Sequence, residues 1–278
     1  MKTFRPDPFM LKWGVPEAGY EWQKGSDSEP HLVSRAEIGS LVWIKEPLQN
    51  SGLFIEFANL KPTQDAIKQF ANTWGDIFSK YGPLDLMPQQ KGSLSLIMGA
   101  SFEKWKDAIG EMRVLVRLWE AVKDPKHKRA DLAKVITWAH GGVRYTIPFP
   151  HGAAHCWLAH PEIDRELLAR FSPGDVLWPA KYALQAEINK RLANPEISCV
   201  PRLIWTAERN QRIIFTPMNL LGAMWLQFAQ AVTEEFQLRV CEGCGKYFQI
   251  GPGGKRRADA TTCGPACRQR KRRKKLLQ

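Results

Sequence analysis

Apolar side chains recur every three or four residues in several stretches of the chain, which is the spacing of one face of an α-helix. One such stretch begins at Thr63, a residue type that caps helices, and Gly82-Pro83 predicts its end. A second helix is predicted to begin at Ser101. Shorter periodic segments predict three further helices, over residues 130–140, 164–171 and 180–192.

The strongest apolar stripe lies near the C-terminal end of the chain. Thr216-Pro217 provides a capping residue and then a proline suited to the first helical position. The apolar face of the helix predicted after it consists of Leu220, Leu221, Met224, Trp225, Phe228, Val232 and Phe236. This helix is expected to run almost directly into Cys241.

Short apolar runs without helical spacing predict strands. Residues 40–44 and 143–149 form two such runs, and residues 53–57 form a third that could equally begin a short helix. Residues 202–206 and 212–215 flank a polar segment and predict a hairpin. Residues 1–35 show no clear period, and an extended arm or an irregular entry to the fold is expected there.

The composition indicates a packed protein without a membrane-spanning helix. Apolar residues make up 44% of the 278 residues, and 11 Trp and 13 Phe require burial. No apolar run reaches the ~18 residues that a transmembrane helix needs. The N-terminal sequence carries two prolines and lacks the apolar region of a signal peptide, so a cytoplasmic location is expected.

The net charge of +12 is concentrated at the C-terminus. Residues 239–278 contain 12 Lys and Arg and two acids, a balance of +10. The other 238 residues therefore hold 28 basic and 26 acidic side chains, a balance of +2. The body is electrostatically ordinary, whereas the last forty residues are strongly cationic.

The cysteines are segregated in the same way. Cys156 and Cys199 lie alone in the body, and Cys199 is interpreted as a buried, inert thiol. The other four follow the spacing C-x2-C-x18-C-x3-C, and they are Cys241, Cys244, Cys263 and Cys267. The first pair predicts a tight knuckle, and the second pair fits the first turn of a helix, where residues i and i+4 share a face.

Four thiolates at this spacing predict one closed, structural Zn²⁺ site. Gly245 suits the positive φ that such a knuckle requires, and Thr261 or Thr262 is expected to cap the helix that follows. The alternative is four unrelated buried thiols. The metal site is favoured because Tyr247, Phe248 and Ile250 are nearly the only local core, so metal binding would supply the folding energy.

The predicted fold class is α+β. A mainly helical body with a small β component is expected over residues 1–238. A small zinc finger with four cysteine ligands, treble-clef or ribbon-like, is expected over residues 239–278.

The basic residues of the finger are candidate nucleic-acid contacts. Even with four thiolates and one Zn²⁺ counted, the finger keeps a charge near +8, and contact with phosphates would relieve its self-repulsion. The alternative is a solvated tail that only aids solubility. The candidates are Lys255, Arg256, Arg257, Arg268, Arg270, Lys271, Arg272, Arg273, Lys274 and Lys275.

His151, His155, Cys156 and His160 fall within ten residues and raise the possibility of a second metal or catalytic site. No H-E-x-x-H pattern is present, and Pro150, Gly152 and Pro161 disfavour a regular helix. Ordinary packing and hydrogen bonding are favoured for these histidines.

Several motifs resemble a bacterial family in which an N-terminal ABATE domain, named for stress-induced transcription regulators, precedes a CGNR-type zinc finger. The resemblance rests on Leu53-Phe-Ile-Glu-Phe-Ala-Asn-Leu60, on Phe70-Ala and Trp74-Gly, on the 220–232 helix that leads into Cys-x2-Cys-Gly-x2-Phe, and on the basic Cys-Arg-x-Arg ending. It implies a DNA-binding regulator with a treble-clef-like finger and a body of sensory role.

The chain departs from this family at the finger's name-giving motif. Cys267 is followed by Arg268-Gln-Arg in place of Gly-Asn-Arg, and Cys263 is followed by Gly-Pro-Ala. The ligand role therefore carries over to the four cysteines, but a role of the asparagine does not.

The expected function is that of a zinc-dependent DNA-binding transcription regulator and not of an enzyme, with DNA favoured over RNA. The body would bind a ligand, a protein partner or a second copy. Two alternatives stay open: a nucleic-acid-binding subunit of a larger nucleoprotein complex, and an enzyme that processes nucleic acid at His151–His160.

Overall fold

The computed structural model describes residues 13–25, 27–36, 41–79, 99–197, 199–205, 211–233, 237–245, 247–250 and 256–276. It confirms the α+β class, with more strand than predicted, because eleven strands in five small sheets accompany eight α-helices in these ranges. None of the helices described there combines the length and apolar character needed to cross a bilayer.

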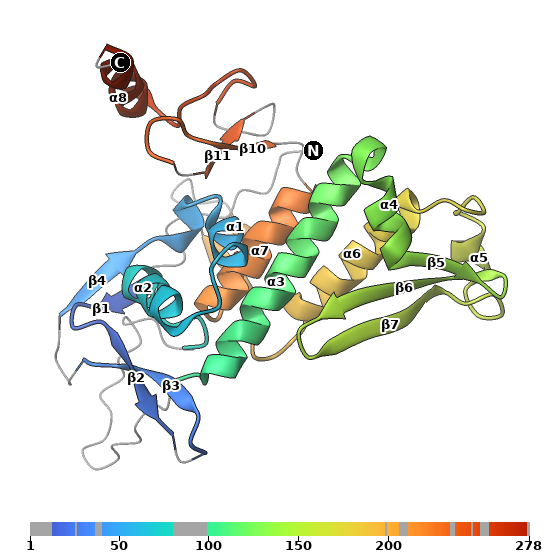
Figure 1. The fold of residues 1–278 in the computed structure, drawn as a ribbon, viewed down its shortest axis with the longest axis horizontal. Helices are drawn as coiled ribbons and strands as arrows, with labels where there is room; N and C mark the ends of the chain where they lie inside the picture. The colour runs from blue at the N-terminus through green and yellow to red at the C-terminus, as the bar shows by residue number, and fades with distance from the viewer. Residues whose placement is uncertain are drawn as a thin grey trace.

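Four helices form the centre of the body (Figure 1). The longest, α3, lies beside α1, α6 and α7. Most of the buried side chains of α3 lie on one face of this helix. These four helices are α1 (Leu53–Ala58), α3 (Phe102–Lys123), α6 (Leu177–Leu192) and α7 (Leu220–Thr233).

Smaller elements cover the two ends of this helical centre (Figure 1). One end carries α2 (Gln64–Trp74), the ribbon of β1 (Trp13–Pro16) with β4 (Val42–Lys45), and the ribbon of β2 (Tyr20–Lys24) with β3 (Pro30–Ser34). The other carries α4 (Pro125–Val135), α5 (Arg165–Leu168) and an antiparallel sheet of β5 (Ile136–Ala139), β6 (Gly142–Phe149) and β7 (Gly152–Ala159).

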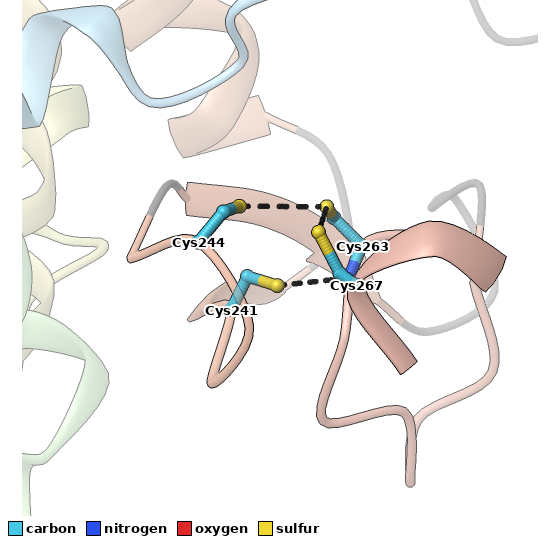
Figure 2. Close-up of side chains that lie close together, drawn as sticks. All are labelled: Cys241, Cys244, Cys263 and Cys267. Carbon is cyan, nitrogen blue, oxygen red and sulfur yellow. Dashed lines mark hydrogen bonds between the residues drawn. The ribbon is translucent and has the colours of Figure 1, made fainter. Parts of the chain in front are cut away.

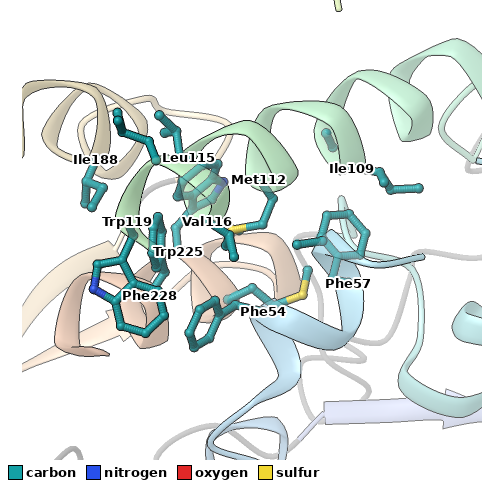
Figure 3. Close-up of a cluster of buried hydrophobic side chains, with 14 of the residues drawn as sticks. Phe54, Phe57, Ile109, Met112, Leu115, Val116, Trp119, Ile188, Trp225 and Phe228 are labelled. Atoms are coloured by element: carbon teal, nitrogen blue, oxygen red, sulfur yellow. The ribbon is translucent and has the colours of Figure 1, made fainter. Parts of the chain in front are cut away.

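Aromatic rings join the central helices (Figure 3). Phe54 of α1 stacks on Phe228 of α7 with ring centroids 5.2 Å apart, and Trp119 of α3 meets Phe228 edge-on at 5.7 Å. Phe54 and Phe228 are fully buried. The apolar run at residues 53–57 is therefore a helix buried almost all round, which explains why its sequence alone fitted a strand equally well.

Two of the predicted helices start as expected. Thr63 caps α2, with its Oγ1 accepting from the Ala66 N–H at 3.4 Å, and Ser101 caps α3 in the same way. The predicted end of α2 at Gly82-Pro83 is wrong, and these residues lie outside the described ranges. The helix ends at Trp74 because Gly75, at φ +95°, takes a conformation that only glycine adopts easily.

The helix predicted over residues 130–140 is wrong at both ends. Pro125 starts α4 at its first position, and the chain changes to strand at Ile136. His140 and Gly141, both at positive φ, then form the two-residue turn between β5 and β6. The predicted extended arm over residues 1–35 is also wrong where it is described, because Trp13 and Val15 bury alternate side chains and pair with β4.

The predicted hairpin is confirmed as β8 (Cys199–Trp205) paired with β9 (Gln211–Pro217). The predicted cap of the following helix is wrong. Thr216 and Pro217 complete β9, and Asn219 caps α7, with its Oδ1 accepting from the Gly222 N–H at 2.7 Å.

A buried carboxyl lies just after α2. Asp76 is only 9% exposed, and its Oδ1 accepts from the Phe78 N–H at 3.2 Å. Burial raises its pKa to about 6, although the Phe78 and Ile77 N–H groups and the charge of Lys104 act in the opposite direction.

Because the folded state raises this pKa, wild type should lose stability as the pH rises from about 4 to above 6, by about 3 kcal/mol. Asp76→Asn keeps an acceptor for Phe78 and cannot ionise. Urea denaturation should therefore find the variant more stable than wild type near pH 7.5, with the gap narrowing near pH 4.5. The same difference in the free energy of unfolding at both pH values would contradict the raised pKa of Asp76.

Candidate metal centre and basic surface

The last part of the chain is a hairpin followed by a helix. Strands β10 (Gln237–Val240) and β11 (Tyr247–Ile250) pair antiparallel, and α8 (Pro265–Leu276) follows the loop after them. Cys241 and Cys244 lie in the turn between the strands. The expected positive φ at Gly245 is confirmed at +74°, and the Gly245 N–H donates to the Cys241 carbonyl at 2.7 Å.

The structure brings the four predicted cysteines together (Figure 2). All four sulfur atoms lie within 4.8 Å of one another. Cys244 Sγ is 3.7 Å from Cys263 Sγ, which is 3.4 Å from Cys267 Sγ. Four sulfurs in a tetrahedron around Zn²⁺, each at ~2.3 Å from it, would be roughly 3.8 Å apart, so this group has the dimensions of a metal site.

Close backbone contacts hold the two cysteine pairs together. A Cβ atom on Gly243 would lie 2.6 Å from the Cys267 carbonyl oxygen, so only glycine allows the knuckle to approach α8 this closely. The Cys263 N–H donates to Cys241 Sγ at 3.3 Å. Main-chain contacts therefore help to hold the four sulfur atoms in place.

The thiols of this cluster differ in acidity. Burial alone would raise the pKa of Cys241, but N–H donors from Cys263, Gly243 and Cys244 outweigh it and lower the pKa below that of a free thiol. The pKa of Cys263 is raised, by burial and then by its neighbouring sulfurs. A bound dication would lower the pKa of all four cysteines, because it stabilises their thiolates together.

The helix of the site begins later than predicted. Pro265 is its first residue, and the Arg268 N–H donates to the Gly264 carbonyl at 3.0 Å. Thr261 and Thr262 therefore do not cap it, and Cys263 precedes the helix while Cys267 lies in its first turn.

α8 carries seven Lys and Arg and no acid. Most of the predicted contact residues whose side chains are described are exposed, and these are Arg256, Arg257, Arg268, Arg270, Arg272, Arg273 and Lys274. Lys275 is in the helix, but its side chain, like all of Lys255, lies outside the described part of the structure.

Lys271 differs from its neighbours. It is half-buried, forms a salt bridge with Glu242, and donates from Nζ to Thr261 Oγ1 at 3.0 Å. Its charge is used within the finger, so the prediction that it contacts a ligand is not supported by its surroundings.

The finger is seated on the body. Its own small core consists of Cys241, Phe248 and Ile250, whereas Tyr247 and Leu238 pack against the core of the body. A Cβ on Gly52, just before α1, would lie 2.2 Å from Tyr247 Cβ. The assignment of Tyr247 to the local core of the finger was therefore wrong, because its ring reaches α1.

A hollow of about 390 Å³ lies in the body between α3, the β6–β7 turn and the end of α6. The buried guanidinium of Arg191 contacts Glu187 and lies 3.3 Å from Glu111 Oε2, while Tyr145 Oη donates to Glu187 Oε1 at 2.7 Å. His151 Nε2 is 3.3 Å from Glu111 Oε1. These ionisable groups beside the hollow therefore pair with one another.

The candidate histidines are not gathered into a site. His155 lies on β7 with its Nδ1 3.0 Å from Thr146 Oγ1, and His151 and His160 lie just outside the two ends of that strand. The absence of a regular helix here is confirmed. In the part of the chain that the structure describes, the four cysteines form the one group of His, Cys, Asp or Glu residues close enough to hold a metal ion.

Comparison with protein-family models, curated proteins and solved structures finds no match to this chain. The similarity to the ABATE/CGNR family therefore rests on the motifs in the sequence.

The purified chain should carry one metal ion, because the four sulfurs form one group. Cys263→Ser should lose it, since a serine hydroxyl is a poor ligand for a soft metal site. Cys156→Ser, which alters a body thiol, should keep one ion per chain. Elemental analysis after exhaustive dialysis measures both, and equal metal content in the two variants would contradict the site.

Proposed function

We propose that this protein is a zinc-dependent nucleic-acid-binding protein, most specifically a DNA-binding transcription regulator. The observation that supports this best is the attachment of a helix with seven basic residues and no acid to a four-cysteine cluster of metal-site dimensions.

Zinc is the proposed metal because four sulfur ligands at tetrahedral separations are typical of closed Zn²⁺ sites. The order of the elements supports a treble-clef-like finger: a hairpin supplies Cys241 and Cys244 at its turn, and α8 supplies Cys267. With every coordination position taken by sulfur, this ion has no open position for a water or substrate. The proposed role of the metal is therefore structural.

The charge of α8 is unfavourable for the helix by itself. Arg268 and Arg272, and likewise Arg270 and Lys274, are four residues apart on the same face, and like charges at this spacing destabilise a helix by about 0.2–0.5 kcal/mol per pair. An anionic partner would remove this cost. Polymeric phosphate is the partner that best matches a row of exposed arginines, since its counterions are released on binding.

Duplex DNA is favoured over duplex RNA by the shape of this element. A helix with its side chains is about 10–12 Å across and fits the ~12 Å major groove of B-form DNA. The major groove of A-form RNA is too narrow for side chains to read. Anchoring α8 through the cysteines would present it as one rigid body.

The body offers surfaces for a protein partner, which favours the second candidate function, a subunit of a larger nucleoprotein complex. Trp43 on β4 is 58% exposed, and Leu203 and Ile213, which face each other across the β8–β9 hairpin, are 65% and 63% exposed. Exposed apolar side chains that adjoin one another, as those of Leu203 and Ile213 do, are typical of interaction surfaces.

The proposal is tested by titrating labelled duplex DNA and single-stranded RNA with the zinc-loaded protein across ~50–200 mM salt. Wild type should bind with log K falling against log salt at a slope of about −5 to −7. A variant with the basic residues of α8 changed to Gln, which keeps the helix propensity high, should lose this binding while retaining one metal ion.

Binding that is absent in wild type, or unchanged in the Gln variant, would show that α8 is not a nucleic-acid-binding element. Tighter binding to RNA would keep the nucleic-acid proposal and replace the transcription regulator with an RNA-binding protein.

A further inference from the structure

We infer that Arg256, Arg268 and Arg272 form a phosphate-binding site in the finger. This site holds the nucleic-acid backbone and so sets the position of α8 on the nucleic acid. This rests on the proposed nucleic-acid binding and goes beyond it, because it divides seven of the finger's basic residues into three groups with different roles.

The site is a hollow of about 320 Å³ between α8 and the loop that leads to Cys263. Its lining includes the three arginines, Lys271 and the neighbouring Thr261, and no acidic residue. Guanidinium forks and a hydroxyl around a concave surface match the oxygens of a phosphate group.

The three arginines come from two separate segments that the fold brings together. Arg268 and Arg272 are one turn apart on α8 and so share a face. The main chain of Arg256 forms an isolated β-bridge with that of Ile250, and the Arg256 Nε donates to the Cys263 carbonyl at 3.0 Å. This hydrogen bond fixes the Arg256 guanidinium beside the start of α8, so less side-chain entropy is lost when a ligand binds.

The charges of the three arginines are available to a ligand. All three are exposed, and within the described residues none of them forms a salt bridge. Lys271 also lines this hollow, but it forms a salt bridge with Glu242, which lies between Cys241 and Cys244. Its role is to neutralise Glu242, which would otherwise repel a phosphate.

A second hollow on the other side of Arg268 and Arg272 indicates a polymer as the ligand. It is lined by Pro265, Ala266 and Gln269 together with the same two arginines. These arginines therefore form a ridge between two hollows. A strand that crosses the ridge can place successive phosphates on either side, whereas a free phosphate ion can use only one side at a time.

Arg270, Arg273 and Lys274 provide a matched comparison. They are exposed, belong to the same helix and line neither hollow. Changing all three to Gln removes the same charge as changing Arg256, Arg268 and Arg272 to Gln. The two triple variants therefore separate a shaped site from general electrostatic attraction.

The experiment measures fluorescence anisotropy of labelled duplex DNA with the full-length, zinc-loaded chain and both triple variants, across a salt series. The Arg256→Gln, Arg268→Gln, Arg272→Gln variant should lose about 100-fold or more in affinity and about 3 from the salt slope. The other triple variant should lose about tenfold or less. Inorganic phosphate at equal phosphate concentration should compete more weakly than unlabelled DNA.

Equal losses in the two variants, with wild type still binding, would overturn the phosphate site and leave the proposed function standing. Absence of nucleic-acid binding by wild type would overturn both. Metal content is measured for every variant. If replacing Arg256 releases the metal, the double variants Arg268→Gln, Arg272→Gln and Arg270→Gln, Arg273→Gln make the same comparison within α8 alone, with the same opposing outcomes.

Discussion

The finger depends on one electrostatic constraint. Four sulfur atoms that lie within 4.8 Å of one another cannot all be thiolates unless a cation lies among them. The finger has few apolar residues of its own, chiefly Phe248 and Ile250, so a cation bound by the four sulfurs would supply much of its folding free energy. The position of α8 relative to the hairpin would then depend on this interaction, because Cys267 lies in its first turn.

The finger is also tied to the body, which gives the body influence over the basic helix. Tyr247 reaches from β11 to the core of the body, and Gly52 beside α1 leaves room for it. Helix α7 lies at the centre of the same core through Phe228, only a few residues before β10. A ligand or partner that shifts α1 or α7 would therefore act on the elements that carry the cysteines.

The sequence predicted best what depends on near neighbours and least what depends on distant ones. The cysteine spacing, the caps at Thr63 and Ser101, and the β8–β9 hairpin are local patterns and were predicted. The N-terminal strands are too short to show a period, and the pairing of β1 with β4 joins residues far apart in the chain. Likewise, no local pattern distinguishes Lys271, which forms a salt bridge with Glu242, from Arg272, which is exposed.

A metal held by the four cysteines should make the basic helix competent to bind nucleic acid. The most direct measurement returns Zn²⁺ stepwise to the metal-free, full-length protein while the binding of labelled duplex DNA is followed. DNA binding should appear with the first equivalent of metal and reach its limit there, because one sulfur cluster is present. Binding that is equally tight without metal would contradict the claim.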